Sequence, residues 1–126
     1  MLSKLHKAVA ELLKEMFPVH QFLYEYPYSK IKVDDIYLHA ISSRLHADIY
    51  DVTFGIIYEI QGIQHYEQIE FFGGTKGFSD QKRVDRWKRQ IVGESESIDL
   101  VEIPYDFKLN KENLLRLIKE AKVDIR

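Results

Sequence analysis

The feature that most constrains the fold is a pair of apolar segments between residues 45 and 61. In residues 45–50 apolar and polar side chains alternate, which is typical of a strand with one buried face. Residues 56–61 are almost continuously apolar, which indicates a strand buried on both faces at the centre of a sheet. A turn at Thr53 and Phe54 would join the two segments as an antiparallel hairpin.

The rest of the chain supplies helices and further strands around this hairpin. The spacing of apolar residues predicts helices at about 2–17, at about 80–92 between Ser79 and Gly93, and after Asn110. It predicts further strands at 21–28, around 36–38 and at 98–103. A chain of 126 residues that is 45% hydrophobic suffices for one compact domain, residues 1–126. We therefore expect a single-domain α/β fold, a mixed sheet flanked by helices.

Two acidic residues interrupt the apolar strands. Asp48 and Glu59 would each cost roughly several kcal/mol if they were buried without a partner. In the expected hairpin they lie opposite each other on one face of the sheet, and Gln61 lies on the same face. Thr-Phe is not a favoured two-residue turn, and a slip of the turn would change this pairing. Two close carboxylates need a proton or a cation between them, and Mg²⁺ suits such a site. In the alternative interpretation, Arg44 or Lys88 simply pairs with the acids.

Positive charge gathers in one segment although the net charge is −2. Residues 76–89 carry a local balance of +4, which leaves −6 on the remainder. The basic residues of this segment are Lys76, Lys82, Arg83, Arg86, Lys88 and Arg89. Such a stripe can bind a phosphate backbone, or it can be the solvated face of a helix.

Several classes of protein are excluded by what the sequence lacks. Without cysteine there is no disulfide, thiol catalysis or Cys-ligated zinc. No apolar run approaches the roughly 18 residues of a membrane span. The first residues, MLSKLHKAVAELLKEMF, carry a charge every few positions and so do not resemble a signal peptide. We expect a cytoplasmic protein without a membrane partner.

The run HADIYDVTFGIIYEIQGIQHYE resembles the core of the PD-(D/E)xK nuclease superfamily, the restriction-endonuclease-like fold. The nearer likeness is to the branch that contains very short patch repair endonucleases and related phage homing-type nucleases. That branch has an Asp strand, an acidic strand running into Gly and then His, a Gly-rich loop, a helix bearing Asp, and a last strand ending in Ile-Pro-Tyr. The corresponding elements here are Asp48, Glu59–Gly62, His65, the Gly73-Gly74 loop, Asp85 and Leu100–Tyr105. The likeness covers roughly residues 44–105, and the first predicted helix fits the leading helix of that fold.

This resemblance implies a DNA endonuclease that depends on Mg²⁺, or on Mn²⁺ in its place. It implies that Asp48, Glu59 and the backbone carbonyl of Ile60 bind the metal, and that His65 is the general base or holds the attacking water. The basic residues of 76–89 would bind the DNA backbone.

The main departure from the superfamily pattern is Gln61, which stands where a lysine is usual. A glutamine can orient a water or a phosphate oxygen, but it has no positive charge. Lys88, one helical turn from Asp85, could supply that charge, and both helix residues are then candidate catalytic residues. The departure also allows a catalytically inactive nucleic-acid-binding module of the same fold, or a protein-interaction subunit whose acids are structural.

Three further residues have structural alternatives. His65 could cap a strand end, and Asp85 could be the hub of surface ion pairs. His6 lies near the place of an acid in the leading helix of the branch, with Glu11 and Glu15 further along, and we expect it to be structural. Because the domain leaves no room for separate recognition elements, we expect specificity to be low, to be directed at DNA structure, or to come from a homodimer or a partner protein.

Overall fold

A four-stranded mixed sheet forms the centre of the molecule. The computed structural model describes residues 3–62 and 74–123, with the side chains of 74–79 and 123 left aside. The strands are β1 (Phe22–Pro27), β2 (His46–Asp51), β3 (Ile56–Ile60) and β4 (Asp99–Ile103), and they lie in the order β1-β2-β3-β4. The first three are antiparallel neighbours, whereas β4 runs parallel to β3. The expected mixed α/β architecture is confirmed, with β3 between two neighbours as its apolar sequence predicts.

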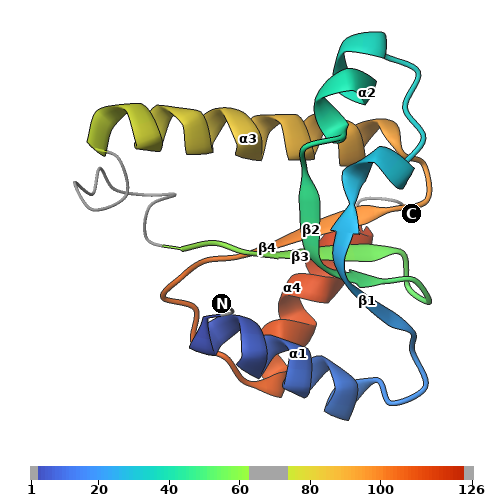
Figure 1. Cartoon of the computed structure of the whole chain (residues 1–126). Coiled ribbons are helices and arrows are strands. Elements are labelled where there is room, and N and C mark those ends of the chain that lie inside the picture. The colour runs from blue at the N-terminus through green and yellow to red at the C-terminus, as the bar shows by residue number, and fades with distance from the viewer. Residues whose placement is uncertain (1–2, 63–73, 124–126) are drawn as a thin grey trace.

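Helices cover both faces of this sheet (Figure 1). They are α1 (Lys4–Met16), α2 (Ile36–Ser42), α3 (Gly74–Glu94) and α4 (Lys111–Val123), and a short 3-10 helix, η1 (Tyr28–Lys30), follows β1. Tyr58 of β3 packs in one core with residues of α1 and α4, and its neighbour Ile57 packs in a second core with residues of α2 and α3. Because successive strand residues point to opposite faces, β3 is buried on both. None of the helices in the described ranges has the length and apolar character needed to cross a membrane.

The hairpin of β2 and β3 has the register that a turn centred on Thr53 and Phe54 predicts. Ile49 pairs with Tyr58 and Asp51 with Ile56, and Asp48 and Glu59 are the next residues along the two strands. The turn is a four-residue loop, not a tight two-residue one. Asp51 holds it: its Oδ1 accepts the N–H of Phe54 at 3.0 Å, and its carbonyl accepts the N–H of Gly55 at 2.8 Å. These bonds explain why an unfavourable turn sequence does not slip.

Residues 36–38, expected as a short strand, belong to helix α2, so that prediction is wrong. Ile36 and Tyr37 favour strands by propensity. However, the side chain of Asp35 caps the helix by accepting the N–H of Leu38 at 3.0 Å. Leu38 and Ser42, four residues apart, are both buried, whereas Ile36 and Tyr37 are exposed. The cap and the helical spacing of the buried residues therefore outweigh propensity.

Helix α3 is longer than the sequence predicts. It begins at Gly74 and ends at Glu94, so the expected limits at Ser79 and Gly93 are wrong. Glycine lowers helix stability by only about 1 kcal/mol, too little to end a helix whose middle is anchored in the core. The face of α3 that packs against the core is formed by Val84, Trp87 and Ile91, which follow the helical repeat. The cap of α4 is confirmed, because the side chain of Asn110 accepts the N–H of Asn113 at 2.8 Å.

Candidate functional site

A polar cavity of about 180 Å³ lies between α3 and the sheet. It is lined by Asp48 of β2, Glu59 and Ile60 of β3, Leu100 and Glu102 of β4, and Gln81, Asp85 and Lys88 of α3. Four of these residues are acids, and Lys88 is the only base among them. The three helix residues share one face because their spacing of four and three matches the helical repeat. The cavity thus brings together five of the residues predicted as site residues, from three elements: Asp48, Glu59, Ile60, Asp85 and Lys88.

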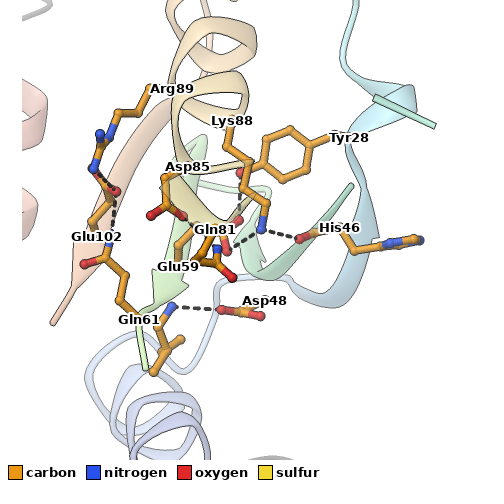
Figure 2. Close-up of polar contacts among 11 residues, drawn as sticks. Tyr28, His46, Asp48, Glu59, Gln61, Gln81, Asp85, Lys88, Arg89 and Glu102 are labelled. Atoms are coloured by element: carbon orange, nitrogen blue, oxygen red, sulfur yellow. Dashed lines mark hydrogen bonds and ion pairs between the residues drawn. The ribbon is translucent and has the colours of Figure 1, made fainter. Parts of the chain in front are cut away.

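The Glu59 carboxylate is buried and each of its oxygens has a donor (Figure 2). The hydroxyl of Tyr28 donates to Oε2 at 2.7 Å, and Nζ of Lys88 donates to Oε1 at 3.1 Å. Lys88 also donates to the backbone carbonyl of His46 at 3.1 Å. The expectation that Lys88 could pair with a buried acid is confirmed, and its ammonium brings a positive charge into the cavity.

Burial raises the pKa of Glu59 to about 7, because a poorly solvated site disfavours the charged form. The ammonium of Lys88 opposes this shift, the negative charge of Asp48 adds to it, and the hydroxyl of Tyr28 again opposes it. Burial and the neighbouring Glu59 raise the pKa of Tyr28 well above its ordinary value. Tyr28 therefore stays a protonated donor, while Glu59 exchanges its proton near neutral pH.

Asp48 is anchored to the end of β3. Its Oδ2 accepts the backbone N–H of Ile60 at 2.8 Å, across the hairpin. This bond holds the carboxylate on the same side of the sheet as Glu59, where both line the cavity. The pair of acids expected on one face is therefore present, with the backbone of Ile60 beside them.

Gln61 does not line the cavity. Its side chain is buried and donates from Nε2 to Oε2 of Glu102 at 2.7 Å, while its backbone N–H donates to the carbonyl of Ile103. Glu102 also accepts two hydrogen bonds from Arg89, at 2.9 and 2.8 Å. In this structure Gln61 positions Glu102, and a direct role of Gln61 in catalysis stays a prediction.

Sequence reasoning missed Glu102 and Tyr28 as site residues. Glu102 pairs in parallel register with Glu59, so both point to the same face of the sheet. An acid within the apolar segment 99–103 is the same signal that identified Asp48 and Glu59, and could have identified Glu102. Tyr28 carried no such signal, because one tyrosine among many aromatic residues does not reveal its hydrogen-bond partner.

The basic residues of the segment 76–89 divide into two groups. Lys88 forms an ion pair with Glu59, and Arg89 forms one with Glu102, both of which are acids of the sheet. The exposed group on the outer side of α3 is Lys82, Arg83 and Arg86. The side chain of Lys76 and the whole of His65 and Gly73 lie outside the described residues.

Two alternatives for single residues are settled by burial. Asp85 is buried and accepts a hydrogen bond from Gln81 at 3.1 Å, so it does not lie at the surface. His6 is buried on α1, the helix that packs against the opposite face of the sheet from the cavity. His6 therefore has no part in this site, in agreement with its expected structural role.

The chemistry of the lining residues suits a hard cation, although their present arrangement pairs them with protein donors. Asp48, Glu59 and the backbone of Ile60 offer only oxygen ligands, and Mg²⁺ is commonly held by one or two carboxylates together with water. Within the described ranges, no three His, Asp or Glu side chains converge closely enough to hold a metal ion. Lys88 takes the position beside Glu59 that a cation would need, so cation binding requires the ammonium to shift.

Comparisons with protein-family models, with curated proteins and with solved structures gave no match. The fold and the site themselves define a mixed α/β protein with an acid-rich cavity between a sheet and its crossover helix.

Proposed function

We propose that the protein is a Mg²⁺-dependent DNA endonuclease of the restriction-endonuclease-like class. The observation that carries the proposal is the convergence of Asp48, Glu59 and Lys88 in one cavity, from β2, β3 and α3. The order of elements supports it: an Asp strand, an acidic strand, a helix bearing Asp85 and a strand that ends before Pro104 follow one another as the sequence resemblance implies.

The residues of the cavity have complementary roles in such a reaction. Asp48, Glu59 and the carbonyl of Ile60 would hold the cation, which, when bound, lowers the pKa of a water and neutralises charge on the scissile phosphate. Glu59 must lose its proton to take part, which its pKa near 7 allows at neutral pH. Once displaced from Glu59, the Lys88 ammonium would stabilise the negative charge that develops on the phosphate. The water-holding role of His65 comes from the resemblance alone.

Helix α3 would bind the substrate as well as line the site. Its outer side exposes Lys82, Arg83 and Arg86, and its inner side carries Lys88. Cationic side chains on one helix can follow a phosphate backbone and place a scissile bond at the cavity. DNA is therefore the proposed partner.

A catalytically inactive nucleic-acid-binding module is the second candidate. It is favoured by the ion pair between Lys88 and Glu59, which compensates the buried carboxylate without a metal, and by Gln61, whose amide is engaged by Glu102. In this case the surface of α3 would bind DNA while the cavity only stabilises the fold.

A cleavage assay on duplex, nicked, mismatched, branched and flapped DNA tests the proposal. Each substrate is incubated with Mg²⁺, Mn²⁺ or EDTA and with wild type, Asp48→Asn, Glu59→Gln or the control Glu112→Gln. The amides keep the shape of the acids, and Glu112 is an exposed acid of α4. We expect metal-dependent cleavage by wild type and the control, and a loss of at least about 100-fold in both site variants.

Other outcomes of this assay exclude the proposal. DNA binding without cleavage under either cation would favour the inactive module. Full activity of Asp48→Asn or Glu59→Gln would show that the cavity is not the active site.

A further inference from the structure

Tyr28 is held firmly beside Glu59, which lines the cavity. It begins η1 directly after the edge strand β1, and its side chain is fully buried. Its backbone N–H donates to the carbonyl of Leu45 at 2.9 Å. The ring is therefore fixed at the backbone end, and the hydroxyl reaches Glu59 at the other end, 2.7 Å from Oε2.

The same tyrosine also contacts Lys88. Nζ of Lys88 lies 5.5 Å from the centre of the Tyr28 ring, within the range of a cation–π interaction. Nζ lies 3.1 Å from Oε1 of Glu59. One side chain thus touches both charged groups of the proposed site, the carboxylate through its hydroxyl and the ammonium through its ring.

The two oxygens of the Glu59 carboxylate have different donors. Tyr28 donates to Oε2, and Lys88 donates to the other oxygen, Oε1. A carboxylate fixed by a neighbouring donor presents one oxygen in a constant direction, and such outer partners govern how well a metal ligand works.

We infer that Tyr28 is a positioning residue, which orients Glu59 through its hydroxyl and Lys88 through its ring. The inference rests on the proposed nuclease function and adds to it a residue that the sequence resemblance does not include. Tyr28 acts through Glu59 and Lys88. Its loss should therefore change the rate of turnover and the affinity for the cation, but not the affinity for DNA.

The experiment compares Tyr28→Phe with Tyr58→Phe. Each change removes one buried hydroxyl and keeps the ring. Tyr58 is equally buried, but it lies on the opposite face of the sheet, and its hydroxyl has no hydrogen-bond partner among the described residues. Steady-state cleavage gives kcat and KM for DNA. Titration of Mn²⁺ followed by electron paramagnetic resonance gives the cation affinity without turnover, and near-ultraviolet circular dichroism gives the folded fraction used to normalise both.

We expect Tyr28→Phe to lower kcat by about 10- to 100-fold and to weaken Mn²⁺ binding, with KM for DNA nearly unchanged. Tyr28→Leu, which removes the ring as well, should lower kcat further because Lys88 loses its contact with the ring. Tyr58→Phe should match the wild type in all three quantities.

The results separate the two proposals. A wild type that neither cleaves DNA nor binds Mn²⁺ overturns the proposed function. An active wild type with a Tyr28→Phe variant whose kcat and Mn²⁺ affinity equal those of Tyr58→Phe overturns the role of Tyr28 and leaves the nuclease assignment intact.

Discussion

A carboxylate buried in a sheet needs donors, and Glu59 obtains them from two elements that are distant in sequence. The hydroxyl of Tyr28 and the ammonium of Lys88 each bind one of its oxygens. Even so, burial outweighs these donors and leaves the pKa of Glu59 raised, to about 7. The residue is therefore both a candidate metal ligand and a pH-dependent element of stability.

Stability should fall as the pH rises through the titration of Glu59. The pKa in the folded state, about 7, exceeds the ordinary 4.5, so the folded protein binds the proton more tightly. The contribution of Glu59 is complete below its unfolded pKa and is lost as the pH rises through the folded pKa, by roughly 3 kcal/mol. Urea unfolding between about pH 4 and 8 without divalent cations measures this.

Glu59→Gln should lack this component, whereas the exposed control Glu112→Gln should retain it. Equal pH dependence in wild type and Glu59→Gln would contradict the raised pKa.

Lys88, not Gln61, is expected to carry the positive charge of the reaction. Lys88→Met keeps most of the side-chain volume and should slow cleavage by about 100- to 1000-fold, the usual effect of losing one charge-stabilising group. Gln61→Ala removes the bond to Glu102 and no charge, and we expect a smaller loss. Single-turnover rates of the two variants decide between them, and a larger loss in Gln61→Ala would assign the role to Gln61.

At the scale of elements, the register of the β2–β3 hairpin depends on its turn. Gly55 has a φ of 72°, a conformation that other residues rarely adopt. Its carbonyl accepts the N–H of Asp99 at 2.8 Å, so the turn also meets the start of β4. This turn therefore fixes two strands relative to β3, and with them the acids of the cavity.

Gly55→Ala should destabilise the protein. A Cβ at this position would lie 2.4 Å from the carbonyl oxygen of Ser97, in addition to the unfavourable φ. We expect the free energy of unfolding to fall by at least about 2 kcal/mol. Gly93→Ala is the matched control: it lies in α3 with nothing within 4 Å of a new Cβ. It should raise stability by up to about 1 kcal/mol. Similar unfolding midpoints for the two variants would disprove the role of the turn.

The outer side of α3 should govern DNA affinity. Replacement of Arg83 and Arg86 by Gln together should weaken binding and reduce the slope of log K against log salt by about 2, one for each lost phosphate contact. Fluorescence anisotropy across a salt series measures both. Arg116→Gln with Lys119→Gln, two exposed changes on α4 at the opposite face of the sheet, is the control. If both double variants bind alike, α3 is only a solvated helix.

The elements that the sequence predicted well are those whose signal is local. The alternation in 45–50 and the continuous apolar run of 56–61 gave β2 and β3, and the centre of the turn gave their register. Residues 36–38 were predicted as a strand because Ile36 and Tyr37 favour strands by propensity, whereas the cap at Asp35 makes them the start of α2. The predicted start of α3 is too late because Ser79 is a favourable cap residue and the glycines before it favour a loop.

At the scale of the whole molecule, the residue pattern within single strands and helices predicts only part of the site. Asp48 and Glu59 could be predicted because an acid in an apolar strand is conspicuous. The contact of Lys88 with Glu59 depends on how α3 lies across the sheet, which no spacing in the sequence specifies. Tyr28 reaches the same carboxylate from η1, and that meeting is a result of tertiary packing alone.

The parallel pairing of β3 with β4 has a consequence for how the protein folds during its synthesis. Parallel neighbours cannot be joined by a tight turn, and here all of α3 lies between them. Pairings between segments so distant along the chain form slowly during folding. A chain still emerging from the ribosome, with β4 not yet synthesised, would hold Asp48 and Glu59 but lack the strand bearing Glu102. The cavity can be completed only after β4 has been made and has paired with β3, so a nascent chain that still lacks residues 99–103 has no complete cavity.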